Sequence, residues 1–286
     1  MDFTPPSLQD LWNQPTAYRA DYLSGTVALV SGGGTGIGRA TALLMARLGA
    51  KVAICGRKPE KLEPVVAFAK AQGATVAAFQ TDIRKPDEIA VTFEKLEAEL
   101  GPLDILVNNA GGQFAQPAID FSQRGFTAVV ENNLFGTWFM MQTAARRWRD
   151  AGRPGAIVNV VTVIDRGMPG VAHTTAARAG VIYLSKTVAV EWAPLKIRVN
   201  CVAPGVIATE GMAVYSDEAR AAFPRANPML RPGEPLDIAE AVVYLGAPSG
   251  KFITGDTLTV DGGGRLWGEI WTHGKPEYFK EPAGKP

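Results

Sequence analysis

The chain has 286 residues, enough for one large α/β domain or two small ones. Its 47% hydrophobic and 20% charged residues are typical of a globular protein, and a net charge of +1 excludes the basic excess of a nucleic-acid-binding protein. No apolar run reaches the roughly 18 residues of a membrane span, and residues 1–15 lack the pattern of a secretion signal. Cys55 and Cys201 have no CxxC partner or nearby His cluster. We therefore expect no disulfide, no metal site and a cytoplasmic location.

Short apolar runs alternate with amphipathic stretches along most of the chain. The runs rich in β-forming residues lie at 26–31, 51–56, 75–81, 103–109, 156–162 and 197–204. Uninterrupted apolar character is typical of strands buried on both faces of a parallel sheet. Amphipathic stretches between them, such as 39–49 and 86–101, each end at a glycine, as helices do. The alternation predicts the α/β class, with a Rossmann-type doubly wound sheet in a single domain over residues 24–264.

Three segments fall outside this alternation. Residues 1–23 form a proline-containing arm, and residues 207–235 form a long insertion that we expect to act as a substrate lid. Residues 265–286 form a tail, whose aromatic residues either pack on the surface or contact a neighbouring subunit. These aromatic residues include Trp267, Trp271 and Tyr278.

A glycine-rich turn follows the first predicted strand and opens the first predicted helix. Gly32, Gly36 and Gly38 have the spacing GxxxGxG. Glycines allow a tight turn and a close approach of phosphate to main-chain N–H groups, and the helix N-terminus favours negative charge. Such a run alone is also compatible with a plain turn, but its place between strand and helix predicts dinucleotide binding. The candidate cofactor-binding residues of this turn are Gly32, Gly34, Thr35, Gly36, Ile37 and Gly38.

The end of the second predicted strand indicates which dinucleotide is bound. An acidic residue there would hold the ribose hydroxyls of NAD, but this chain has Gly56 followed by Arg57 and Lys58. Two cations without a carboxylate suit a 2′-phosphate, so we predict NADP(H). The alternative is that the two cations are a solvated pair at the start of a helix.

Several separated motifs together resemble the short-chain dehydrogenase/reductase family. They are SGGGTGIG, LVNNAGG, VAVEWAPLKIRVNCVAPGVI and FITGDTLTVDGGG, in that order within residues 24–264. The resemblance implies a seven-stranded parallel sheet and a homo-oligomer, either a tetramer or a dimer. It places Asp82, followed by Ile83, at the adenine, and Asn133 at a structural water or a lysine. It also implies that the cofactor is walled by Asn109, Ala110 and Gly111, and that the nicotinamide is flanked by Pro204, Gly205 and Ile207.

Two segments are similar to a narrower group within that family. Residues 108–114, NNAGGQF, resemble the corresponding loop of 2-enoyl-CoA and 2,4-dienoyl-CoA reductases. Residues 172–181, AHTTAARAGV, are similar to the matching helix of peroxisomal trans-2-enoyl-CoA reductase, which also lacks the family's Tyr and has Arg for Lys. The last three residues, Gly284, Lys285 and Pro286, are not a peroxisomal address, which again favours the cytoplasm.

In most members of the family, a Tyr and a Lys stand where this chain has Thr174 and Arg178. An aliphatic hydroxyl is a far weaker acid than a phenol, and a guanidinium cannot lose a proton and so cannot relay one. Arg178 can still place a fixed positive charge and several donors against the nicotinamide ribose. Because the two residues are four apart, they share a helix face, and the family's geometry can persist with different chemistry.

Other candidates surround this pair in the sequence. Thr162 matches a Ser of the family and either donates to a substrate carbonyl or is satisfied by nearby backbone. His173, one of two histidines, is a candidate proton donor because its pKa lies near neutrality; alternatively it is a cap or a surface residue. Tyr183 falls on the opposite side of the helix and is rejected as a displaced catalytic Tyr. Asp165 and Arg166 either border the site or form a surface pair.

The loss of the family's Tyr and Lys favours one reaction over another. Interconverting an alcohol and a ketone needs a group that exchanges a proton with the substrate oxygen. Reducing a C=C bond conjugated to a thioester instead develops charge on the carbonyl oxygen, which fixed donors can stabilise. We therefore predict an NADP(H)-dependent reductase of α,β-unsaturated acyl thioesters, with catalytic roles for Asn133, Thr162, His173, Thr174 and Arg178. The alternatives are an alcohol dehydrogenase or carbonyl reductase of the same fold, acting for example on a branched or terpenoid alcohol, and a cofactor-binding pseudoenzyme.

The predicted lid carries two sets of candidate substrate-binding residues. Flexible apolar side chains can line an acyl pocket, or they can simply pack the lid on the domain; they are Met212, Tyr215, Phe223 and Met229. Arginines can meet the phosphates of coenzyme A, although scattered Arg is usually ordinary surface; they are Arg220, Arg225 and Arg231.

Overall fold

The apolar runs assemble into one parallel sheet. The computed structural model describes residues 5–268, 272, 275–276 and 279, and within them the sheet has seven parallel strands in the order β3-β2-β1-β4-β5-β6-β7. The strands are β1 (Val27–Ser31), β2 (Lys51–Gly56), β3 (Val76–Gln80), β4 (Ile105–Asn108), β5 (Gly155–Val160), β6 (Ile197–Pro204) and β7 (Thr257–Val260). The order reverses between β1 and β4, which creates the crevice where such sheets bind ligands. The predicted doubly wound sheet is confirmed.

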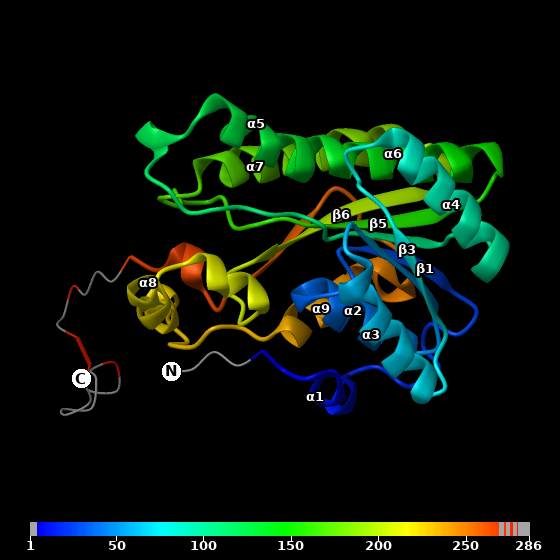
Figure 1. The fold of residues 1–286 in the computed structure, drawn as a ribbon, viewed down its shortest axis with the longest axis horizontal. Coiled ribbons are helices and arrows are strands. Elements are labelled where there is room, and N and C mark those ends of the chain that lie inside the picture. The colour runs from blue at the N-terminus through cyan, green and yellow to red at the C-terminus, as the bar shows by residue number, and fades with distance from the viewer. Residues whose placement is uncertain (1–4, 269–271, 273–274, 277–278, 280–286) are drawn as a thin grey trace.

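Helices cover both faces of the sheet (Figure 1). One layer contains α2 (Gly36–Arg47), α3 (Pro59–Ala71) and α9 (Pro235–Gly246), and the other contains α4 (Pro86–Leu100), α6 (Gly136–Asp150) and α7 (Ala172–Trp192). Neighbouring residues of β1 show why the strands are apolar throughout. Val30 packs in the cluster under α2 and α9, whereas Leu29 packs in the cluster under α4 and α6, and both are fully buried. Each face of the sheet therefore has its own hydrophobic core.

The N-terminal arm is fastened to the first of these layers. It contains α1 (Leu8–Asn13), and its Leu11 and Leu23 are buried in the core around α2. Arg47 at the end of α2 donates to the backbone oxygens of Trp12 and Gln14. The arm is therefore held by burial and hydrogen bonds, and its boundary at residue 23 remains a prediction.

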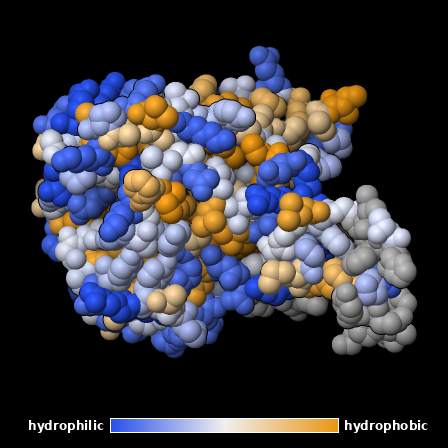
Figure 2. All heavy atoms as spheres, turned by 180° about the vertical axis from the view of Figure 1, so that it is seen from behind, coloured by the Kyte–Doolittle hydropathy of each residue, from blue (hydrophilic) through white to orange (hydrophobic). Residues whose placement is uncertain are grey.

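Two segments project beyond the carboxyl ends of the strands (Figure 1). One follows β4 and leads into α5 (Gln123–Val130); its tip carries hydrophobic side chains (Figure 2), and Ile119 within it is 93% exposed. The other is the predicted lid after β6, which contains α8 (Asp217–Ala222) between 3₁₀ turns at Glu210–Val214 and Phe223–Ala226. Both segments follow carboxyl ends near the crevice, so we place the candidate site between them.

Two other predictions concern the aromatic residues of the tail and the absence of a membrane-spanning helix. Trp267 lies 5.0 Å from Phe279, centroid to centroid, whereas Trp271 and Tyr278 lie outside the described residues. None of the helices in the described part of the chain is long and apolar enough to cross a membrane.

Candidate active site

The glycine-rich turn adopts a backbone shape that other residues disfavour. Gly32 has a φ of 67° and Gly36 a φ of 51°, both in the left-handed region. A Cβ on Gly38 would lie 2.3 Å from the carbonyl oxygen of Gly32, so a side chain there would disrupt the turn. The turn ends at the N-terminus of α2, within the same segment as Gly34, Thr35 and Ile37. This is a cradle that only glycine leaves open, and it fits the pyrophosphate of a dinucleotide.

An acidic residue of the lid already faces this helix N-terminus. The backbone N–H of Gly36 donates to Glu210 Oε2 at 3.0 Å, and Glu210 Oε1 lies 2.7 Å from Arg39 Nη2. Thr209 lies beside the same glycine. Sequence reasoning missed Arg39 and Glu210 because nothing local links the lid to α2.

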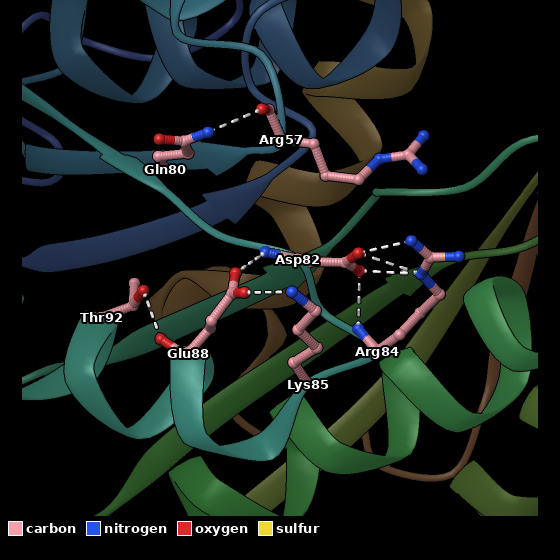
Figure 3. Close-up of polar contacts among 7 residues, drawn as sticks. All are labelled: Arg57, Gln80, Asp82, Arg84, Lys85, Glu88 and Thr92. Atoms are coloured by element: carbon pink, nitrogen blue, oxygen red, sulfur yellow. Dashed lines mark hydrogen bonds and ion pairs between the residues drawn. The ribbon is translucent and has the colours of Figure 1, made fainter.

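A polar cluster lies where β2 and β3 end. Arg57 and Lys58 are exposed, and Figure 3 shows the Arg57 side chain extending to the same side as the carboxylate of Asp82. Arg84 donates from Nε to both oxygens of Asp82, at 2.9 and 3.1 Å. These hydrogen bonds lower the pKa of Asp82 to about 2. The cluster brings two arginines to the edge expected for the adenosine half of a cofactor, and Arg84 was not predicted.

The loop after β4 is tied to the end of β1. The hydroxyl of Ser31, which is buried, accepts from the backbone N–H groups of Asn109 and Ala110 at 3.1 and 3.0 Å. The side-chain amide of Asn109 donates to the backbone oxygens of Ser31 and Gly32. The predicted wall residues and the glycine turn thus form one unit. Ile83 is buried and packs closely on Gly136 at the start of α6.

Asn133 joins the loop after β4 to helix α7. It lies in a π-helical turn, Glu131–Phe135, a feature common at functional sites. Its Nδ2 donates to Thr174 Oγ1 at 2.8 Å and to the backbone oxygen of Gly112 at 3.0 Å. Because Thr174 Oγ1 accepts this bond, its own proton is available to donate elsewhere.

Arg178 is a buried cation without an acid partner among the described residues. Its side chain lies one turn after Thr174 and the residue is 7% exposed, with Nη1 lacking any hydrogen-bond partner and Nη2 3.4 Å from the Ala110 oxygen. Burial lowers its pKa to about 10, so it stays charged at neutral pH. A Cβ on Gly111 would lie 2.1 Å from Nη2. An unpaired buried charge is costly, and a ligand that supplies oxygen atoms would offset that cost.

His173 lies next to Thr174 at the start of α7, within an aromatic cluster. It is fully buried, so the surface alternative is wrong, and its ring centroid lies 4.6 Å from that of Phe114 and 4.5 Å from that of Phe121. Its Nδ1 accepts from the backbone N–H of Thr174 at 2.8 Å, while Nε2 has no partner. Burial lowers its pKa, so it is neutral at pH 7. The ring packs in an aromatic cluster with Phe114, Phe121 and Phe126, and its catalytic role stays a prediction.

The remaining candidates on or just before α7 differ in their exposure and contacts. Thr162 is partly exposed just after β5. Tyr183 is 67% exposed, which confirms that it points away from the site. Arg166 does not form a simple surface pair: its guanidinium donates to the backbone oxygens of Ala226 in the lid and Trp267 in the tail, at 3.2 and 2.8 Å. Arg166 therefore connects the loop after β5 to both segments.

The end of β6 leads directly into the lid. Gly205, after Pro204, donates to the Val260 oxygen at 3.0 Å, and a Cβ on it would lie 2.8 Å from the Cα of Asp261. Ile207 forms an isolated bridge with Gly233. A cavity at the base of the lid is lined by residues that include Val206, Ile207, Met229, Arg231 and Val260.

The lid's own candidates are mostly engaged with each other. Met212 is buried, and Tyr215 and Phe223 meet edge to face with centroids 5.2 Å apart. Arg220 pairs with the adjacent Asp217, and Arg231 lies 3.5 Å from an oxygen of Asp237. Arg225 also has a partner. These ion pairs favour a structural role for the lid arginines over binding of coenzyme A phosphates.

The chain matches known proteins over most of its length. A family model described as enoyl-(acyl carrier protein) reductase matches residues 32–264. A probable 2,4-dienoyl-CoA reductase of Bacillus subtilis is 38% identical over 82% of this chain and 94% of its own. A 3-oxoacyl-[acyl-carrier-protein] reductase of Staphylococcus aureus is also 38% identical, over 82% of this chain and 96% of its own. A solved citronellol catabolism dehydrogenase of Pseudomonas aeruginosa PAO1 is 36% identical, covering 88% of this chain and 100% of its own, with a TM-score of 0.79. Together with the parallel sheet and the glycine cradle at its switch point, these matches show that the chain belongs to the short-chain dehydrogenase/reductase family of NAD(P)(H)-using oxidoreductases.

Proposed function

We propose that the protein uses NADP(H) to reduce a C=C bond conjugated to a thioester carbonyl. The observation that carries this proposal is the set of donors on α7. Thr174 has a hydroxyl proton free to donate, and the buried guanidinium of Arg178 lies one turn further along the helix. Neither group exchanges a proton near neutral pH, but both suit an oxygen on which negative charge develops.

The residues that would hold the dinucleotide come from the ends of the strands. The glycine cradle and the N-terminus of α2 would take the pyrophosphate, and Asp82 and Ile83 would meet the adenine. Asn109, Ala110 and Gly111 would form the wall, Arg178 would bind the nicotinamide ribose, and Pro204, Gly205 and Ile207 would flank the nicotinamide ring. When bound, the reduced cofactor supplies a hydride.

Fixed hydrogen-bond donors would stabilise the carbonyl oxygen of the substrate. Addition of a hydride at the β-carbon moves an electron pair onto the carbonyl oxygen of the thioester, and the substrate becomes an enolate. Thr174 and Thr162 can each donate a hydrogen bond to that oxygen, and Asn133 fixes the orientation of Thr174. The charge of Arg178 lowers the energy of the anion without any proton transfer to oxygen. Carbonyl reduction, by contrast, requires that proton.

Arg57 provides the first test, which concerns the choice of cofactor. Because the β2 end presents Arg57 and Lys58 and no carboxylate, we expect Arg57→Asp to weaken NADPH binding far more than NADH binding. Lys70→Asp makes the same charge change at the far end of α3 and should leave both affinities unchanged. Dissociation constants from fluorescence titration check this, and an equal loss of both cofactors would refute the 2′-phosphate assignment.

The reaction itself is tested by comparing substrate classes. Purified enzyme with NADPH is offered crotonyl-CoA, a 2,4-dienoyl-CoA and acetoacetyl-CoA, and with NADP⁺ it is offered citronellol. The proposal expects turnover of the unsaturated thioesters and little of the others. Preference for acetoacetyl-CoA or citronellol would favour the activities for which the Staphylococcus and Pseudomonas relatives are named. Tight NADPH binding without any turnover would favour a pseudoenzyme.

A further inference from the structure

The proposed reduction leaves one step without an assigned residue. After the hydride has arrived, the α-carbon of the enolate must receive a proton. An enolate carbon is a strong base, so a phenol with an ordinary or raised pKa is acidic enough, and the depressed pKa that carbonyl reduction demands of a phenol is unnecessary. The donor must only lie at the site and have an O–H or N–H to give.

Most groups of this kind in the described residues are placed elsewhere. The hydroxyl of Tyr18 donates to the Glu240 oxygen, and that of Tyr22 accepts from Ser249 on the surface near α9. Tyr183 and Tyr244 are 67% and 42% exposed on the outer sides of their helices. His173 is fully buried among phenylalanines, so its ring has no exposed surface from which to regain a proton.

Tyr215 differs from these residues in its contacts. Its hydroxyl accepts a hydrogen bond from the side-chain amide of Gln113, which comes from the loop after β4. Gln113 directly follows Gly112, whose backbone N–H and C=O both bond to Asn133. Asn133 in turn bonds to Thr174. Hydrogen bonds, together with the backbone of residues 112–113, therefore connect the Tyr215 phenol in the lid to the hydroxyl on α7.

Two further features suit Tyr215 to proton donation. Because its oxygen accepts from Gln113, its own proton points elsewhere, as in Thr174. The edge-to-face contact with Phe223 fixes the ring, and the phenol is only partly exposed, so it can regain a proton from solvent. Burial raises its pKa, and it therefore stays protonated across the neutral range.

We infer that Tyr215 is the catalytic proton donor to the α-carbon of the substrate, supplied by the lid because Thr174 stands where most of the family has a Tyr. The inference rests on the proposed enoyl-thioester reduction. The nicotinamide dinucleotide is oxidised and the substrate C=C bond is reduced. As the enolate collapses, its electron pair forms a C–H bond at the α-carbon and the O–H bond of Tyr215 breaks. The phenolate then takes a proton from water, so one hydride and one proton are added in all.

The test compares two tyrosines that differ in position. With crotonyl-CoA as the substrate, Tyr215→Phe should lower kcat roughly 100-fold relative to wild type, with little change in KM. A loss of this size is typical when a general acid is removed. Its solvent deuterium isotope effect should rise, because slow protonation by water becomes limiting. Butyryl-CoA, the saturated product, should bind unchanged by calorimetry, since only the hydroxyl is removed. Tyr183→Phe removes an exposed phenol and should behave as wild type.

A second variant keeps the phenol but removes its orientation. Gln113→Leu should lower kcat less than Tyr215→Phe and leave the fold intact, because Gln113 is only partly buried. If wild type reduces crotonyl-CoA and Tyr215→Phe retains its kcat and isotope effect, the assignment of Tyr215 is wrong while the proposed function stands. If wild type reduces no unsaturated thioester, the proposed function fails first, and the inference fails with it.

Discussion

Gly111 and Gly112 are adjacent in the chain but differ in what surrounds them. A Cβ on Gly111 would lie 2.1 Å from Arg178 Nη2, whereas on Gly112 the nearest atom would be Asn132 Nδ2 at 3.9 Å. Because Gly111 has no side chain, the Arg178 guanidinium can lie against its backbone. A single methyl group can therefore test the position of Arg178 without altering its charge.

We predict that Gly111→Ala displaces the Arg178 guanidinium and weakens dinucleotide binding by roughly tenfold or more, since one charged hydrogen bond is worth about 1.5–3 kcal/mol. The fold should survive, because the clashing atom ends a flexible side chain. Gly112→Ala should bind the cofactor as wild type does. Calorimetric titration of both variants checks this, and equal affinities would show that Arg178 does not depend on the space beside Gly111.

At the scale of whole elements, the lid and α2 meet through Glu210. Its carboxylate accepts from the Gly36 N–H and pairs with Arg39, so an anion of the chain occupies the start of the helix expected to bind the pyrophosphate. The same N–H cannot serve both anions. The first turn of α2 and the lid are thus coupled, and dinucleotide binding should require this contact to change.

We expect Glu210→Gln to tighten NADPH binding roughly two- to fivefold, because a charge at a helix terminus is worth about 0.3–1 kcal/mol. Glu218→Gln removes an exposed charge from α8 in the same lid and should have no effect. Titrations at low salt would measure the difference. Weaker binding by Glu210→Gln would mean instead that the carboxylate holds the lid closed over the cofactor.

At the scale of the whole molecule, several large apolar side chains are left uncovered. On α7, Tyr183 is 67% and Val190 77% exposed, and Trp192 at its end stacks on Trp138 of α6. Phe252 near β7 is fully exposed. Apolar side chains that are exposed together mark interaction surfaces, and Tyr183 and Val190, two turns apart on α7, are the candidates here. They agree with the expected homo-oligomer, a tetramer or a dimer.

We therefore predict that light scattering after gel filtration gives a mass of two or four chains, and that Val190→Asp lowers it by replacing an exposed apolar side chain of α7 with a charge. Val91→Asp, on α4 and 47% exposed, serves as the matched change outside that face and should leave the mass unaltered. A wild-type mass equal to that of one chain would refute the predicted oligomer.

The sequence predicted the features that depend on neighbouring residues. It did not predict the contacts between segments that are far apart in the chain. The strands follow from uninterrupted apolar runs, and the glycine turn follows from its spacing, because both depend on neighbouring residues. The bond between Gly36 and Glu210 spans 174 residues, and the one between Gln113 and Tyr215 spans 102. The burial of His173 was missed for the same reason, since the phenylalanines that bury it belong to residues 114–126. No pattern within one segment reveals such pairings.

The solitary guanidinium of Arg178 links the lifetime of the protein to its cofactor. Folding removes water from this cation, and no carboxylate of the described residues pairs with it, so its burial costs free energy in the native form without a ligand. A ligand that binds only that form and solvates the cation with its own oxygens shifts the folding equilibrium by mass action. We therefore expect that, with the dinucleotide bound at Arg178 as proposed, the native fraction rises with the supply of dinucleotide and a cell short of it holds less of the intact protein.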